Sequence, residues 1–242
     1  MLTFHVITLF PDLIDTYCST SILGRGKTFG HFQLKTYNPR DFCQDKYRKV
    51  DDTPYGGGSG MLLKPEPIFA ALESIERAPG SPIIFPNPHG SLLTQELIEN
   101  LAAQSDIVII CGHYEGIDER IKTLVTLEIS LGDFVITGGE LPALTLIDAV
   151  GRLTPGVLGK ASSLADESFN DGLLEAPQYT KPAIFRGMEV PAVLRSGDHK
   201  AIAKWRREES LRITYQRRPD LLKEARLGAQ DQIFLKSIGA DD

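Results

Sequence analysis

Two glycine-bearing turns after apolar runs limit most strongly what this chain can fold into. The first run starts at Ile107 and ends in CGHYEG, residues 111–116, and the second ends in GGE, residues 138–140. Each passes directly into a helical pattern, and glycine lets a ligand approach the main chain closely. Open α/β sheets bind ligands beyond the carboxyl ends of their strands. Either turn alone is equally consistent with a tight connection, but the pair indicates a site for a polar ligand.

The remaining periodicity predicts an α/β fold whose mostly parallel sheet is covered on both faces. Residues 24–30 are interpreted as a mobile basic loop and residues 86–90 as a rigid turn. The expected strands are 3–10, 32–37, 82–85, 106–111 and 133–137, and the expected helices are 11–18, 64–76, 94–103, 117–124 and 141–153.

A small, polar and acidic segment, residues 160–172, interrupts this alternation and is typical of a linker. Beyond it the strand patterns stop. Asp198 is placed to cap a helix that runs to about Tyr215, and short helices are expected after Pro219 and Gly228. We therefore predict three parts: an α/β domain (1–160), a flexible linker (161–173) and a small all-helical domain (174–242).

Charge is distributed unevenly along the chain. The net charge of the 242 residues is −6, yet residues 181–226 hold twelve Lys or Arg against six Asp or Glu. Such a local basic patch lets an acidic protein bind phosphates, although a charge run is more often a solvated face.

The composition also indicates the compartment. Three cysteines without metal-binding spacing suggest reduced thiols in the cytoplasm. The N-terminal MLTFHVITLF is interpreted as a strand instead of a signal peptide, no apolar run has transmembrane length, and no histidine pair has the spacing of a zinc site. We expect neither a membrane partner nor a metal centre of this kind.

Several long motifs resemble one known family. They are ITLFP (7–11), YGGG (55–58), GML (60–62), YEGIDER (114–120), GD (132–133), GGELP (138–142), PGVLG (155–159), VP (190–191), SG (196–197), WR (205–206) and RRP (217–219). With these motifs, which run almost from end to end, the chain resembles the bacterial tRNA (guanine-N1)-methyltransferases of the knotted SPOUT class.

The resemblance implies an enzyme that uses S-adenosylmethionine to methylate N1 of the guanosine 3′ to the tRNA anticodon. It also implies a trefoil knot near the C-terminal end of the sheet and a homodimer with sites at the subunit interface. Whether Mg²⁺ assists is left open. By similarity, the cofactor is expected to contact Phe85, Pro86, Asn87, Pro88, Gly90, Gly112, Tyr114, Glu115, Ser130, Leu131, Gly132, Phe134, Ile136, Gly138, Gly139 and Pro142.

The catalytic residues are also carried over by resemblance. The family's arginine falls on Arg152, which would stabilise the charge that builds on guanine as N1 loses its proton. The family's base is usually an aspartate directly before Ser-Phe, where this chain has Glu167, with Asp166 one residue earlier. Glu167 is therefore the expected base and Asp166 the alternative. Another departure is His113, where the family usually has arginine.

Basic residues of the C-terminal part are the expected contacts to tRNA phosphates: Arg206, Arg207, Arg217 and Arg218. Two other functions remain as alternatives. One is a non-catalytic RNA-binding or assembly factor that holds a nucleotide in the same loops. The other is a magnesium-dependent phosphohydrolase using Asp118, Glu119 or Glu140.

Overall fold

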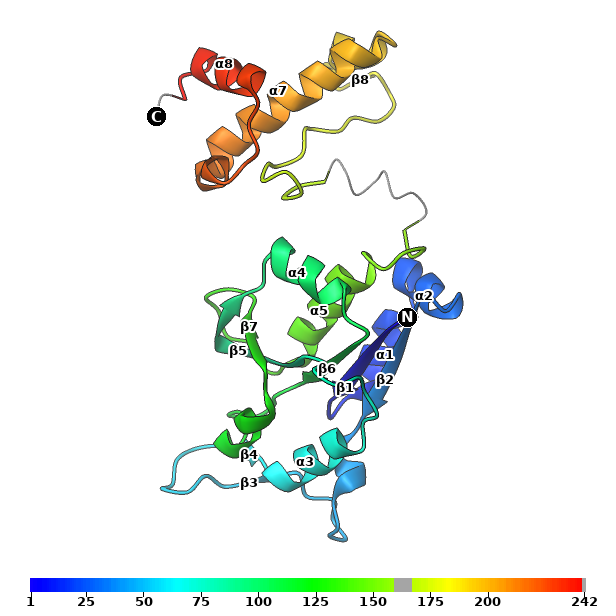
Figure 1. The fold of residues 1–242 in the computed structure, drawn as a ribbon, viewed down its shortest axis with the longest axis vertical. Helices are drawn as coiled ribbons and strands as arrows, with labels where there is room; N and C mark the ends of the chain where they lie inside the picture. The colour runs from blue at the N-terminus through cyan, green and yellow to red at the C-terminus, as the bar shows by residue number, and fades with distance from the viewer. Residues whose placement is uncertain (159–166, 241–242) are drawn as a thin grey trace. The chain divides into compact units, whose positions relative to one another are not determined.

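The chain divides into two compact units, residues 1–159 and 160–242 (Figure 1). The structure is a computed structural model, and it describes residues 1–158 and 167–240.

A five-stranded sheet in the order β2-β1-β6-β5-β7 forms the centre of the first unit. Every pairing in it is parallel, so the prediction of an α/β fold with a mostly parallel sheet is confirmed. The central strand β6 reads DIVII and buries four residues, as expected for a strand covered on both faces. The strands are β1 (Leu2–Ile7), β2 (Phe32–Tyr37), β5 (Ile83–Leu92), β6 (Asp106–Ile110) and β7 (Leu127–Ser130).

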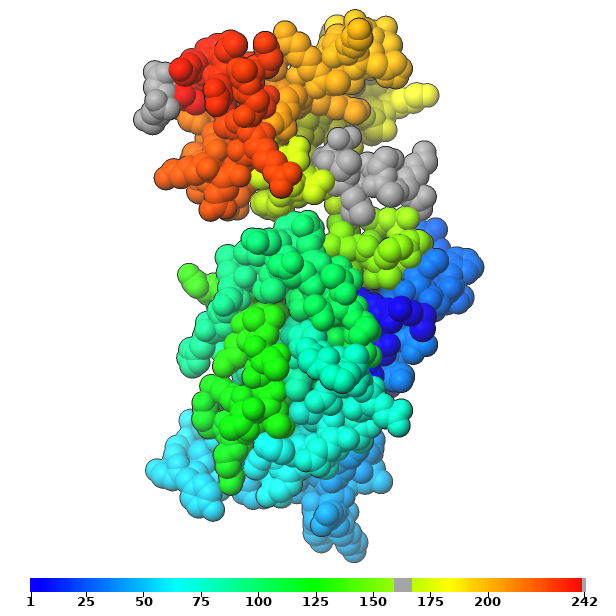
Figure 2. All heavy atoms as spheres, in the orientation of Figure 1, coloured from blue at the N-terminus to red at the C-terminus, as the bar shows by residue number. Residues whose placement is uncertain are grey.

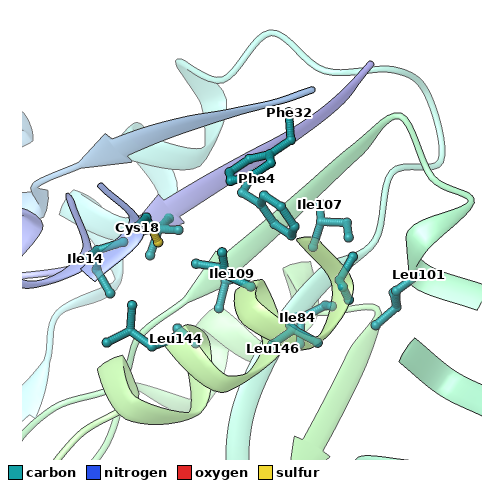
Figure 3. Packing of buried hydrophobic residues seen from close by; sticks show 14 of the residues in the cluster. Phe4, Ile14, Cys18, Phe32, Ile84, Leu101, Ile107, Ile109, Leu144 and Leu146 are labelled. Carbon is teal, nitrogen blue, oxygen red and sulfur yellow. The ribbon is translucent and has the colours of Figure 1, made fainter. Parts of the chain in front are cut away.

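Side chains of β6 alternate between two hydrophobic cores, because successive residues of a strand point to opposite faces. Ile107 and Ile109 belong to the core shown in Figure 3. Val108 and Ile110 belong to the core on the other face. The first core is covered by α1 (Pro11–Cys18), α2 (Ser21–Thr28), α4 (Gln95–Ala102) and α5 (Glu140–Gly151), and the second by α3 (Pro65–Glu73), η1 (Pro39–Phe42) and η2 (Glu119–Leu124).

The expectation of a mobile basic loop at residues 24–30 was wrong. Residues Ser21–Thr28 form helix α2, in which Gly24 and Gly26 are buried. A Cβ on Gly24 would lie 2.3 Å from the carbonyl oxygen of Ser19, and one on Gly26 would lie 3.0 Å from Val157. These glycines permit close packing and do not provide flexibility.

A second difference concerns the strand expected at residues 133–137. The edge strand β7 lies earlier, at Leu127–Ser130, where it pairs with β5. Residues 131–139 form a loop in which Phe134 and Val135 are exposed by 57% and 88%. The apolar pattern of this loop therefore does not reflect burial in the sheet.

The second unit is built on the long helix α7 (His199–Arg217), which Asp198 caps by accepting hydrogen bonds from two backbone N–H groups. Leu173, Leu211 and Leu235 form its small core. The other elements are β8 (Ile184–Phe185), β9 (Met188–Glu189), η3 (Ala192–Arg195), η4 (Pro219–Lys223) and α8 (Ala229–Ser237).

The prediction that this part is entirely helical missed the hairpin of β8 and β9. Arg186 and Gly187 connect the two strands, and both have positive φ angles, 52° and 80°. Such a two-residue turn matches the twist of paired strands. The strands are too short to leave a periodic pattern in the sequence.

Within residues 1–158 and 167–240, no helix combines the length and apolar character needed to cross a membrane.

Candidate functional site

A cavity of about 290 Å³ lies where β6 and β7 end, beside the irregular middle of β5. Its location is the one that open α/β sheets use for ligands. Three chain segments build it, namely residues 85–88, 112–116 and 129–139, together with Pro142 of α5. The structure thus brings together Phe85, Pro86, Asn87, Pro88, Gly112, Tyr114, Glu115, Ser130, Leu131, Gly132, Phe134, Ile136, Gly138, Gly139 and Pro142.

Gly90 is the expected cofactor residue that the cavity lining does not include. A Cβ at this position would lie 2.4 Å from the backbone nitrogen of Ile129. Gly90 therefore allows β5 to pack closely against β7. Five residues outside the expected set of cofactor contacts also line the cavity: His113, Gly116, Ile129, Val135 and Thr137. Two of these lie in the segment that was interpreted as a strand.

The two glycine-bearing turns touch each other. The backbone N–H of Gly139 donates a hydrogen bond to the carbonyl oxygen of Gly112 at 2.8 Å. A Cβ on Gly139 would lie 2.8 Å from Cys111 Cα and from Gly112 N, which are backbone atoms that cannot move aside cheaply. Only glycine fits here without displacing the end of β6.

The loop that follows β7 is held by short-range hydrogen bonds. The backbone N–H of Gly132 donates to Ser130 Oγ at 3.2 Å, and that of Phe134 donates to the carbonyl oxygen of Gly132 at 3.0 Å. Gly132 has a φ angle of +140°, which side chains other than glycine rarely adopt. The loop therefore reaches over the cavity in a defined shape and presents Phe134 and Ile136 to it.

A buried carboxylate lies beneath the second turn. Glu140, at the first position of α5, is only 5% exposed, and its Oε1 accepts a hydrogen bond from Thr8 Oγ1 at 2.8 Å. The positive end of the helix dipole stabilises a negative charge at this position. Burial, with a smaller contribution from nearby Glu140, raises the pKa of the Cys111 thiol well above its usual value. Cys111 is therefore a neutral packing residue.

His113 lines the cavity and carries a buried polar atom without a partner. Its Nδ1 is buried and has no hydrogen-bond partner among the residues that the structure describes. Its ring contacts the rings of Phe10 and Tyr114, with centroids 5.1 and 4.8 Å away. Buried polar atoms in native proteins are nearly always paired. The Nδ1 atom of His113, which the protein itself covers, is an exception among the described residues.

Glu115 connects the cavity to the glycine-rich loop at residues 56–60. Its backbone N–H donates to the carbonyl oxygen of Met61 at 3.0 Å. Gly60, with a φ angle of +84°, lies against the Glu115 side chain, since a Cβ there would be 2.2 Å from Glu115 Cγ. The neighbouring Tyr55 is fully exposed.

The expected catalytic residues fall in different units. Arg152 follows α5 directly, at the C-cap position, in the first unit. Glu167 belongs to the second unit, where it lines a groove of about 1150 Å³ together with Arg206 and Arg207. Asp166 lies outside the described residues.

The four arginines expected to hold tRNA differ in their local partners. Arg207 donates to both carboxylate oxygens of Asp231, at 2.8 and 3.1 Å, and Arg218 binds Asp220 at 2.7 Å. Neither Arg206 nor Arg217 takes part in an ion pair with another described residue. Arg206 and Arg217 are therefore better placed for an external phosphate.

The part of the chain that the structure describes contains no metal-binding cluster. No group of three or more His, Cys, Asp or Glu side chains among these residues is arranged to hold a metal ion.

Comparison with known proteins places these features in a family. The pattern of the family described as tRNA (Guanine-1)-methyltransferase TrmD matches residues 2–224. The chain belongs to this family. A tRNA (guanine-N(1)-)-methyltransferase of Dictyoglomus turgidum is 49% identical over 238 residues, which cover 98% of this chain and 97% of that protein.

Two further relatives carry the same name. The protein of Nostoc punctiforme is 52% identical over 228 residues, covering 94% of this chain and 96% of the relative. That of Caldanaerobacter subterraneus subsp. tengcongensis is 49% identical over 236 residues, covering 98% of each. The resemblance inferred from the motifs is thereby confirmed for nearly the whole chain.

Proposed function

We propose that this protein methylates N1 of guanine in tRNA, as the names of its relatives state for them. S-adenosylmethionine is the methyl donor, and the guanosine 3′ to the anticodon is the target. The observation that carries the proposal is the cavity formed by the touching turns at Gly112 and Gly139, in a chain that belongs to this methyltransferase family.

The cavity residues fit the proposed cofactor. Phe85, Phe134 and Ile136 offer apolar surface to a purine ring, and the glycine turns bring backbone groups close enough to bond its polar edge. S-adenosylmethionine, when bound, supplies an activated methyl group on a sulfonium.

The chain's own residues provide the acid–base chemistry in this proposal. The Glu167 carboxylate removes the N1 proton of guanine, and Asp166 is the alternative base. Arg152 donates hydrogen bonds to the guanine oxygen as negative charge builds there. The walls of the cavity exclude water from the reacting atoms, and positioning lowers the barrier further. We propose that residues 161–173 act as the linker that carries the base, and residues 174–242 as the tRNA-binding domain.

We further propose that the protein works as a homodimer in which Arg152 and Glu167 of one site come from different copies. Support comes from exposed apolar side chains at the N-cap of α1, in α1 and in α5: Phe10, Leu13 and Leu141 are exposed by 45%, 47% and 58%. A surface with such side chains on a soluble domain is typical of an interface. Leu13→Lys should convert dimers to monomers in analytical ultracentrifugation and abolish turnover. A dimeric Leu13→Lys variant would exclude this surface as the interface.

The trefoil knot of the SPOUT class and a cytoplasmic location complete the proposal. The knot is supported by the contacts of Gly138 and Gly139 with His113 and Gly112, which join the loop before α5 to the residues that follow β6. The location is supported by tRNA as the substrate and by the unpaired thiols of Cys18, Cys43 and Cys111.

Transfer of labelled methyl from S-adenosylmethionine tests the function. The substrates are an unmodified tRNA transcript with G after the anticodon and the same transcript with A there. Label on the G transcript alone is the expected result. Cofactor and tRNA binding without transfer to either would favour a non-catalytic RNA-binding factor. EDTA in the same assay, with Mg²⁺ added back, decides whether the metal assists.

A further inference from the structure

The groove in the second unit is much larger than the Glu167 carboxylate that lines it. It lies between residues 173–183 and helix α7, coloured yellow-green and gold to orange in Figure 2. Its volume is about 1150 Å³. Aliphatic side chains such as Leu174 and Ile202 line part of it, while Gln178, Tyr179 and Lys181 add polar groups. A groove with this mixture suits a ligand that has both a flat apolar part and a charged part.

Cations in the groove are available for an anion. Among the described residues, Lys181 and Arg206 form no ion pair, and Arg195 has only a distant partner, Glu189 at 3.9 Å. Arg207, in contrast, is committed to Asp231. Cations without an ion-pair partner can bind a phosphate, even though Glu167, Asp171 and Glu175 line the same groove.

An aromatic ring stands beside these cations. Tyr179 is 50% exposed, and its ring is tilted towards that of Trp205 with centroids 6.4 Å apart. Exposed aromatic rings next to basic side chains are the usual platform for unpaired RNA bases, because every base has a face that can stack. The chemistry of this groove therefore matches one nucleotide, with its base on Tyr179 and its phosphate near Lys181 and Arg206.

Glu167 identifies which nucleotide this is. It lines the same groove, and the proposed function makes it the base that acts on the target guanosine. An enzyme that flips a nucleotide out of its stack leaves the neighbouring bases without the base on which they stacked. We propose that the groove binds the nucleotide adjacent to the target guanosine, stacked on Tyr179 and held by Lys181 and Arg206. This inference rests on the proposed function.

Binding of full-length protein to an anticodon stem-loop RNA tests the inference. The RNA is used intact and with an abasic site at each of the two nucleotides that flank the target. Stacking on an aromatic side chain is worth about 1–3 kcal/mol, so Tyr179→Leu should weaken binding roughly five- to hundredfold, whereas Tyr179→Phe should bind as the wild type does. One abasic RNA should weaken the wild type to the same degree, with no further loss in Tyr179→Leu.

Two matched controls accompany this cycle. Phe185 is 55% exposed in the same unit but does not line the groove, so Phe185→Leu should show no coupling to either abasic site. Lys181→Gln and Arg206→Gln should each reduce the slope of log K against log salt concentration by about one, because each removes one phosphate contact. Lys204 on α7 is paired with Glu208 and lies outside the groove, so Lys204→Gln should leave the Tyr179 coupling unchanged.

Failure of the inference is distinguishable from failure of the proposed function. If the wild type methylates the G transcript but the losses from Tyr179→Leu and from the abasic sites add independently, the groove does not hold a flanking base. Coupling between Tyr179 and one flanking base in a protein that transfers no methyl group would uphold the groove as an RNA site and reject the function. Thermal unfolding of each variant shows that the fold is retained.

Discussion

Thr8 donates a 2.8 Å hydrogen bond from its Oγ1 to the carboxylate of Glu140, 132 residues later in the chain, and both side chains are buried. The same hydroxyl accepts the backbone N–H of Phe10 at 3.0 Å. The end of β1 is thereby fixed to the start of α5, directly beneath the second glycine turn.

Thr8→Val should destabilise the first unit by about 1–3 kcal/mol, because it leaves a buried carboxylate without its donor while keeping the side-chain volume. Urea unfolding followed by circular dichroism measures this. Thr145→Val is the control, since the Thr145 hydroxyl donates only to an exposed backbone carbonyl in α5 and should cost much less. If both variants lost the same free energy of unfolding, the Thr8–Glu140 hydrogen bond would contribute no more to stability than the exposed one.

Gly139→Ala should weaken cofactor binding while the protein remains folded. The added methyl group would lie 2.8 Å from the backbone of Cys111 and Gly112, so the two turns must separate. A strain of about 1–3 kcal/mol corresponds to roughly five- to hundredfold weaker binding. Calorimetry with S-adenosylmethionine measures it. Gly228→Ala, whose methyl group would meet only Asp231 at 3.7 Å, should bind the cofactor normally.

Glu167→Gln should slow single-turnover methylation by about 10²- to 10⁴-fold, the usual contribution of a general base. S-adenosylmethionine binding should not change, because Glu167 does not line the cofactor cavity. Glu175→Gln is the matched control: Glu175 lines the same groove and accepts a hydrogen bond from Gln178. If Glu167→Gln kept the full methylation rate and only the double variant with Asp166→Asn lost it, Asp166 would be the general base.

Arg206 and Arg207 are neighbours in the sequence, but we expect their removal to have different effects. Arg207 and Asp231 form a partly buried pair, and the guanidinium lowers the pKa of the Asp231 carboxyl. Arg207→Met should destabilise the second unit by about 1–3 kcal/mol. Arg206→Gln should leave stability unchanged and weaken tRNA binding. Fluorescence of Trp205, the single tryptophan, reports unfolding of this unit. If Arg206→Gln and Arg207→Met lost similar stability, the distinction between a structural Arg207 and an RNA-binding Arg206 would be wrong.

Glycines differ in how much of their role the sequence could predict. The turn at Gly112 was predictable, because a glycine directly after an apolar run marks the place where the buried strand β6 ends and the chain turns. The turn at Gly139 was also expected, but from a strand at residues 133–137 that does not form. The packing role of Gly24 and Gly26 was not predictable, since a buried glycine and a flexible one look alike until the neighbours at Ser19 and Val157 are known. Long-range pairs are hidden in the same way: the Arg207–Asp231 pair spans 24 residues and leaves no periodic signal.

The edge of the sheet shows the same limit in another form. Residues 127–130 and 133–137 both contain apolar side chains, and only the pairing with β5 decides that the first forms a strand. Local pattern cannot distinguish apolar residues that face a core from those that face a ligand cavity. Residues 133–137 of the cavity loop were therefore predicted to form a strand. The family resemblance nevertheless placed residues of the same loop in the cofactor site.

His5 provides a pH-dependent test of the sheet. It is 1% exposed in β1, where its Nδ1 hydrogen-bonds Tyr37 Oη at 3.0 Å and its Nε2 hydrogen-bonds Asp106 at 3.2 Å. Burial lowers the pKa of His5, although the Asp106 carboxylate opposes the shift. The unfolded chain, with a histidine pKa of about 6.5, then binds more protons than the folded chain as the pH falls through that value.

Stability of the first unit should therefore decrease as the pH is lowered from about 7.5 to 5.5, because protons favour the state that binds more of them. His5→Gln should remove part of this dependence. Circular dichroism during urea unfolding measures the slope, and Trp205 fluorescence separates the transition of the second unit. His199, exposed at the start of α7, is the control, and His199→Gln should keep the wild-type slope. If His5→Gln had the same pH dependence as the wild type, protonation of His5 would not be linked to unfolding.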